Sequence, residues 1–131
     1  GLWGGSLQTF LLKVENLYQN KEKNVIMEKG PSEYSKYWTS DYNELYHFYA
    51  HADEFGYVLI SEYSKAAVDF LNRDDEGIEA FTAKDGRVYK YDPNTNELLI
   101  TRNGKIINYF PPIDGEDYFY EQFDKVGDFW N

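Results

Sequence analysis

Residues 97–110, with the sequence ELLITRNGKIINYF, decide the fold class of this chain. Two apolar runs flank the dipeptide Asn103-Gly104, a strong signal of a β-hairpin because both turn positions take a positive φ. Upstream, Lys84-Asp85-Gly86 predicts a second hairpin turn, and residues 92–96 predict the turn that joins the two hairpins. Pro111-Pro112 is expected to close the sheet. We expect strands over residues 78–81, 87–91, 97–101 and 105–110, in an antiparallel sheet of three to four strands.

Helices are predicted before the sheet. Ser6 is a suitable N-cap for a segment whose apolar residues follow the 3.6-residue helical period. Ser40 is a second N-cap, and Ser61 with Glu62 starts a third helix. We expect a first helix that starts at residue 7 and ends within residues 19–23, two further helices over residues 41–52 and 61–71, and a short acidic helix near residues 118–125. The fold class is therefore α+β, with N-terminal helices followed by an antiparallel sheet.

Length and composition limit the possibilities further. The chain has 131 residues, enough for one compact domain and too few for two. We expect a single domain over residues 1–131, with residues 1–40 as a helical N-terminal extension and residues 41–126 as its core. The lack of cysteine excludes disulfides, zinc–thiolate sites and thiol catalysis. No apolar run approaches the ~20 residues that span a bilayer, so we expect a soluble protein without a membrane partner.

The net charge of -10 argues against nonspecific binding to a phosphate backbone. The acidity is unevenly distributed. Residues 77–112, which form the predicted sheet, hold 5 bases and 4 acids, and the rest of the chain holds 8 bases and 19 acids, a net charge of -11. The flanks are therefore acidic, and the predicted sheet is close to neutral.

The chain has two histidines, His47 and His51, spaced i,i+4 on a predicted helix. At this spacing both imidazoles lie on one helix face, and imidazole exchanges protons near neutral pH. The pair is therefore the first candidate for acid–base chemistry. Metal binding is the weaker interpretation, because the block lacks the glutamate of a His-Glu-x-x-His zinc helix. Packing of both histidines in a core is the structural alternative.

A succession of short motifs runs through residues 47–123. The motifs are His47, His51, Asp53-Glu54-Phe55-Gly56, Ser61-Glu62-Tyr63, Phe70-Leu71, Asp85-Gly86, Tyr91-Asp92-Pro93-Asn94-Thr95-Asn96-Glu97, Gly104, Ile106, Tyr109-Phe110, Pro112 and Tyr118-Phe119-Tyr120-Glu121-Gln122. In this order they resemble the ribonuclease domains at the C-termini of bacterial polymorphic and contact-dependent inhibition toxins, of the barnase, EndoU, colicin and RelE-like assemblage. Residues 1–40 lie outside the resemblance.

The resemblance implies metal-independent cleavage of RNA, with tRNA as one candidate target and without a cofactor. Such chemistry needs a base at the 2'-hydroxyl, an acid at the leaving 5'-oxygen and a cation near the phosphate. The candidate residues are His47 and His51 as base and acid, Thr95 as a hydrogen-bond donor, Arg87, Lys90 and Arg102 as phosphate-binding cations, and Tyr91 and Tyr109 as base-stacking rings. The implied partners are RNA and a cognate immunity protein, with no DNA. The implied setting is delivery within a larger toxin that acts in the cytoplasm of a target cell.

Four departures from the family pattern remove expected residues. Ala52 stands for a glycine, Lys90 for an arginine, Ile107-Asn108 for Arg-Thr, and Pro111 for a lysine. In the family pattern, the arginine and lysine that are missing here would stabilise the negative charge that develops on a scissile phosphate. Either the remaining cations substitute for them, or this chain does not cleave RNA.

The alternative is a noncatalytic acidic interaction domain, resembling an immunity protein or a nucleic-acid mimic, that binds a basic protein partner. In this interpretation Thr95 supports a turn, Tyr109 packs in the sheet, and the strand cations keep a surface solvated. The two interpretations predict different structures. An enzyme predicts a cleft where the histidines and the strand cations meet, whereas a binding domain predicts an exposed acidic and aromatic surface with the histidines packed apart.

Overall fold

The structure is a computed structural model that describes residues 7–24 and 29–131. Helices come first along the chain, as expected. Helix α1 (Leu7–Asn24) is followed by a 3-10 turn (Ser35–Tyr37), helix α2 (Asp41–His51), a second 3-10 turn (Ala52–Glu54) and helix α3 (Ile60–Leu71). The strands are β1 (Glu79–Ala83), β2 (Val88–Asp92), β3 (Glu97–Arg102), β4 (Lys105–Phe110) and β5 (Gly127–Trp130), with helix α4 (Glu116–Val126) before the last one.

The strands form one antiparallel sheet in the order β4-β3-β2-β1-β5. The predicted α+β class is confirmed, and the four predicted strands are present as a meander. The sheet has a fifth strand that we did not expect, because the chain returns after α4 and pairs β5 with β1. Pro111-Pro112 therefore ends β4 but does not end the sheet.

Local signals account for most element boundaries. Asn103 and Gly104 have φ values of 51° and 79°, as their hairpin turn requires. The Ser40 hydroxyl accepts a hydrogen bond of 3.0 Å from the Asn43 amide and caps α2. Helix α3 begins one residue earlier than expected, and the Glu62 carboxylate accepts the amide of Leu59 at 3.0 Å. The predicted cap Ser6 lies outside the described residues.

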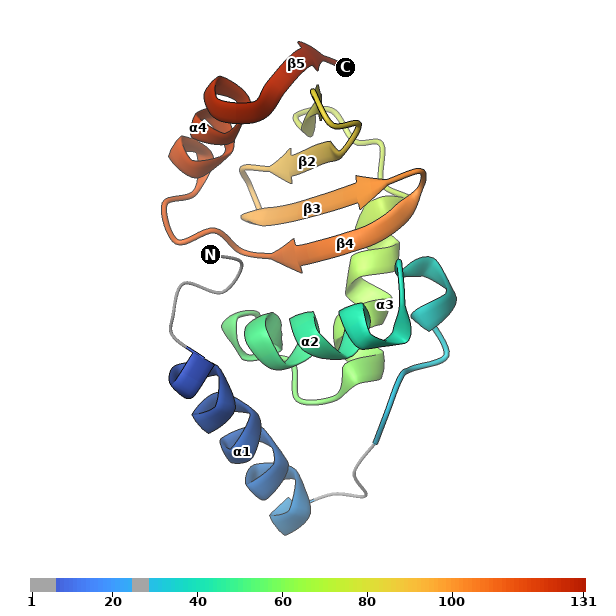
Figure 1. Ribbon diagram of the computed structural model, residues 1–131, viewed down its shortest axis with the longest axis vertical. Coiled ribbons are helices and arrows are strands. Elements are labelled where there is room, and N and C mark those ends of the chain that lie inside the picture. The colour runs from blue at the N-terminus through green and yellow to red at the C-terminus, as the bar shows by residue number, and fades with distance from the viewer. Residues whose placement is uncertain (1–6, 25–28) are drawn as a thin grey trace.

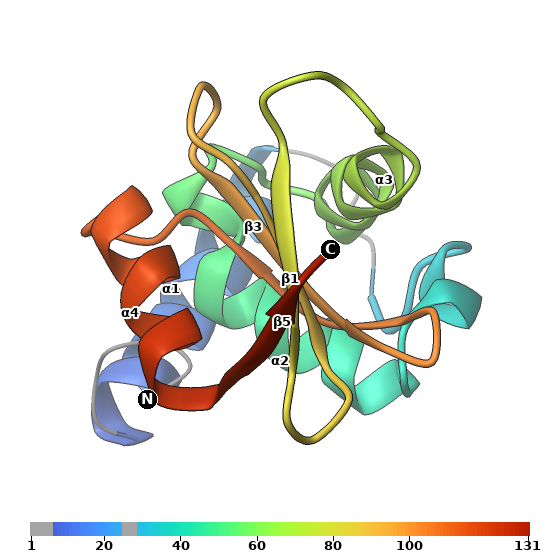
Figure 2. The ribbon, with the colours of Figure 1, turned by 90° about the horizontal axis from the view of Figure 1, so that it is seen from above.

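Helices cover both faces of the sheet. Figure 1 shows α2 and α3 on one side of the strands and α4 on the other, and Figure 2 shows α3 and α4 flanking the sheet from above. Each face has its own core of large side chains. The core under α2 and α3 contains Tyr63, Phe70 and Tyr109, and the core under α4 contains Phe81 and Phe119. This double coverage explains the high aromatic content, because aromatic side chains fill two cores in a small domain.

Helix α4 passes directly into β5 at Gly127. A Cβ atom at this position would lie 2.6 Å from the carbonyl oxygen of Phe123 and 2.3 Å from its ring. Only glycine fits such a close approach of helix and strand. The helix and the strand are therefore joined without an intervening loop.

The two edges of the sheet differ. Residues 36–43 cover β4, where Trp38 forms a parallel bridge with Ile106 and the Thr39 amide donates to the Ile106 carbonyl at 3.0 Å. At the other end β5 pairs with β1 only, and no further strand is present beside it in the described part of the chain. Across residues 7–24 and 29–131, no helix has the length and apolar character needed to cross a membrane.

Candidate functional site

The histidine pair lies inside the protein. The side chains of His47 and His51 project from α2 on the same face, as their spacing predicts, and their rings are parallel with centroids 5.8 Å apart. Only 1% of His47 and 2% of His51 is exposed. The ring of His51 stacks on Phe110 at 5.0 Å, at the end of β4. The pair is thus part of the packed interior in this conformation.

Each histidine has one nitrogen atom that is buried without a hydrogen-bond partner among the described residues, Nδ1 in His47 and Nε2 in His51. The two rings differ in their other contacts. Nδ1 of His51 lies 2.5 Å from Oε1 of Glu54, so a carboxylate orients this imidazole. Burial and the neighbouring His51 lower the pKa of His47 to about 3. His47 is therefore neutral near physiological pH, and His51 is the better candidate for acid–base chemistry.

Lys90, a predicted phosphate ligand, stabilises the C-terminus of α3 instead. Its ammonium group donates to the carbonyl oxygens of Phe70 at 2.8 Å, Leu71 at 3.3 Å and Arg73. Burial lowers the pKa of Lys90. A cation at this position compensates the partial negative charge of the helix end. Its three donors are already used within the protein.

Arg87 and Arg102 lie together at the β1–β2 turn. Both guanidinium groups pair with the same carboxylate oxygen of Asp85, at 3.3 Å from Arg87 and 3.2 Å from Arg102. Arg87 precedes β2, whereas Thr95 follows it in the β2–β3 turn. These predicted phosphate ligands therefore lie at the opposite end of β2 from Thr95.

Thr95 belongs to a turn that is built from its own polar residues. The side chain of Thr95 is hydrogen-bonded to Asp92, and Oδ1 of Asp92 accepts the Asn94 amide at 2.8 Å. Asn96 has a φ of 56°, and its side chain accepts from the Tyr91 hydroxyl at 2.7 Å. The Asp-Pro-Asn-Thr-Asn motif is thus explained by local turn geometry.

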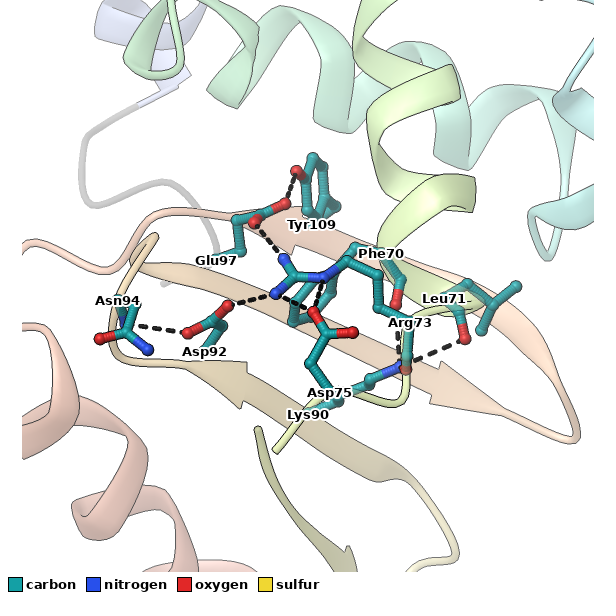
Figure 3. A network of polar contacts seen from close by, with 9 residues as sticks. All are labelled: Phe70, Leu71, Arg73, Asp75, Lys90, Asp92, Asn94, Glu97 and Tyr109. Carbon is teal, nitrogen blue, oxygen red and sulfur yellow. Dashed lines mark hydrogen bonds and ion pairs between the residues drawn. The ribbon is translucent and has the colours of Figure 1, made fainter. Parts of the chain in front are cut away.

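A charged network centred on Arg73 connects this turn to the end of α3 (Figure 3). The guanidinium group contacts Asp92 at 2.7 Å, Asp75 at 2.6 Å and Glu97 at 3.2 Å. Burial raises the pKa of Asp92, but the Asn94 amide and Arg73 outweigh this effect, and the net pKa is lowered. The hydroxyl of Tyr109 donates to Glu97 at 2.5 Å, which adds a buried ring to the network.

The two predicted base-stacking rings are on opposite faces of the sheet. Tyr91 packs on Phe119 of α4 with centroids 5.2 Å apart, and Tyr109 packs on Phe55 at 4.7 Å. Their exposed fractions are 2% and 1%. The structure therefore brings His47 to His51 and Arg87 to Arg102, but it does not gather the histidines, the cations and the tyrosines into one cleft.

A surface pocket of about 330 Å³ lies away from all of these residues. It is lined by Lys29, Pro31, Ser32, Glu33, Ile60 and Ser61. Behind it, the buried carboxylate of Glu44 accepts from the Ser32 amide at 3.0 Å and from the Ser64 hydroxyl at 2.5 Å. These bonds hold the segment before α2 against α3. Across the described residues, no group of three or more histidine, aspartate or glutamate side chains could hold a metal ion.

The most distinctive surface feature, which the analysis of the sequence did not single out, involves α4 and β5. Residues 113–131 contain six acids, Asp114, Glu116, Asp117, Glu121, Asp124 and Asp128, and one base, Lys125, for a net charge of -5. All six acids are exposed. Four large apolar side chains of the same segment are exposed as well, Ile113, Tyr120, Phe129 and Trp130. We call this set of residues the α4–β5 surface. The sequence signal for it was the concentration of half of the net charge in the last 19 residues.

No model of a known protein family matches the chain, and no curated protein sequence matches it significantly. The resemblance to toxin ribonucleases therefore rests on the motif succession alone. Several of its residues, including Asp92, Thr95 and Asn96, have structural roles in the β2–β3 turn.

The buried His47 predicts a loss of stability in acid. Its pKa is about 3 in the folded protein and ~6.5 when unfolded, so below pH 6.5 the unfolded state binds a proton that the folded state does not. We expect this group to reduce the free energy of unfolding by about 2 kcal/mol between pH 7 and pH 5. Urea unfolding at both pH values measures the loss. In His47→Phe most of this pH dependence should disappear, and an unchanged loss in the variant would contradict the assignment.

Lys90 is predicted to be structural. Lys90→Met removes the donor to three carbonyl groups at the end of α3, and we expect the free energy of unfolding to fall by about 2 kcal/mol. Lys65→Met is the matched control, because the Lys65 side chain is 60% exposed and pairs with the equally exposed Asp69. The control should change stability by less than about 0.5 kcal/mol. Equal effects of the two substitutions in urea unfolding would contradict the capping role.

Proposed function

We propose that this chain is a noncatalytic protein-interaction domain, built on a fold like that of toxin ribonucleases, which binds a basic protein partner. The observation that carries the proposal is the α4–β5 surface, a segment that combines six exposed acids with exposed aromatic side chains, two of which, Tyr120 and Trp130, contact each other. Aromatic residues provide large contact area at protein interfaces, and acidic residues around them favour a partner of positive charge.

The positions of the strand cations support the same proposal. The ammonium group of Lys90 donates hydrogen bonds to the end of α3, and the guanidinium groups of Arg87 and Arg102 both pair with the carboxylate of Asp85. A ribonuclease needs cations that are free to approach a phosphate group beside its acid–base residues. Because these cations are engaged in contacts within the domain, the acidic flanks dominate the charge presented to a partner.

A second candidate function is supported by one specific contact. The carboxylate of Glu54 orients His51 through Nδ1, and Nε2 has no partner among the described residues. In a ribonuclease, this nitrogen would remove the proton of a ribose 2'-hydroxyl. The 2'-oxygen would then form a bond to phosphorus as the bond to the 5'-oxygen breaks, and the proton taken up by His51 would return through water to the leaving 5'-oxygen. Because Nε2 is closed to solvent, this chemistry requires a displacement that exposes it.

Charge reversal tests the binding proposal. We expect Asp117→Lys with Glu121→Lys to weaken binding of a deca-lysine peptide by about tenfold in calorimetric titration at low salt, because two exposed acids of the surface change sign. The matched control is Asp74→Lys with Glu76→Lys, which changes the net charge equally at an exposed loop before β1. The control should weaken binding by less than about threefold. Equal weakening by both pairs would show that only total charge matters and would contradict a defined surface.

RNA cleavage tests the second candidate. Purified protein is incubated with total cellular RNA without added metal, and the products are separated by electrophoresis. If His51 is the catalytic base, wild type yields fragments, His51→Ala yields none, and Glu54→Gln is slower by about 10–100-fold because the imidazole loses its orienting partner. His47→Ala is the internal comparison and should retain activity. Intact RNA with folded wild-type protein would exclude this function and leave the binding proposal.

A further inference from the structure

The binding proposal can be made more specific from the open edge of the sheet. Strand β5 pairs with β1 on one side, and no other strand in the described residues pairs with its other side. The opposite edge is covered, because residues 36–43 run alongside β4. The Lys105 side chain also donates a hydrogen bond of 2.6 Å to the Lys36 carbonyl. An uncovered edge presents unpaired backbone donors and acceptors to another chain.

The register shows which backbone groups face outward. The Asn131 amide donates to the Ala80 carbonyl at 3.0 Å, so the backbone of Asn131 faces β1. In an antiparallel pair, alternate residues bond to the same neighbour. Trp130, which lies opposite Phe81 in the register, therefore directs its amide and carbonyl away from β1. These groups are available to an added strand.

Exposed aromatic rings lie on both faces beside this edge. Trp130 is 44% exposed and packs against Phe123 of α4 at 4.4 Å, with Tyr120 at 5.8 Å. Phe129, the next residue back along the strand, points to the other face and is 54% exposed. A strand laid against β5 would cover both side chains, which adds apolar contact to the backbone hydrogen bonds.

We propose that a basic, extended segment of the partner adds to the sheet as a sixth strand beside β5. This inference rests on the proposed function. Charge complementarity selects the occupant, because the α4–β5 surface has a net charge of -5 and a second copy of the chain would bring like charge against it. Asp128 on a short edge strand also discourages pairing between copies. A lysine or arginine in the added strand turns the same carboxylate into an attractive group.

The test separates the backbone contribution from that of the side chain. The probe is a nine-residue peptide that alternates lysine and valine, titrated calorimetrically into the full chain. Trp130→Ala and Trp130→Pro both remove the indole ring, but only proline also removes the outward amide donor. We expect Trp130→Pro to bind the peptide about fivefold more weakly than Trp130→Ala, as the loss of one hydrogen bond of about 1 kcal/mol requires.

Amide hydrogen exchange of the wild-type protein provides a measurement that needs no variant. On addition of the peptide, the Trp130 amide should become protected, while the Asn131 amide, already bonded to Ala80, should change little. Equal affinities of the two Trp130 variants, together with an unprotected Trp130 amide, would overturn strand addition. If Asp117→Lys with Glu121→Lys still weakens binding in that case, the surface binds its partner without pairing to β5. If that pair of substitutions has no effect either, the proposed function itself fails.

Discussion

The contact between Arg73 and the carboxylates at the ends of β2 and β3 connects the helical half of the domain to its sheet. Asp92 and Glu97 lie directly opposite each other in the register, and like charges at such positions repel. Arg73, two residues after the end of α3, bridges both carboxylates, and Lys90 donates to the carbonyl oxygens at the same end of the helix. The helical half thus supplies a cation for two carboxylates of the sheet, and the sheet supplies a cation that binds the carbonyl groups at the end of α3. The relative position of α3 and the hairpin depends on this exchange.

The local parts of the fold were predictable because their causes are local. Asn103-Gly104 requires a positive φ at both positions, and Ser40 caps the helix that follows it. Strand β5 was not predicted, because it has four residues, follows a helix without a turn signal and pairs with a strand more than forty positions earlier in the chain. Only the folded tertiary structure brings β5 beside β1. The prediction that Pro111-Pro112 closes the sheet was wrong for the same reason.

The candidate site was predictable only in part. Helical spacing correctly placed His47 and His51 on one face, but spacing says nothing about what packs against that face. The neighbours include Trp38, from the segment before α2, and Phe110, from the end of the distant strand β4. For the cations too, the sequence gives the charge but not the partner. The sequence identifies Lys90 as a positive charge near an aromatic strand, and only the folded chain shows that a helix end is its partner.

The glycine junction between α4 and β5 has a mechanical consequence. Because Gly127 allows the last turn of the helix to touch the first residue of the strand, there is no slack between them. Force applied along β5 passes directly into α4, whose Phe119 is anchored in the core on that face. We therefore expect a pull on the outer strand to be resisted by the packing of the helix as well as by the hydrogen bonds to β1.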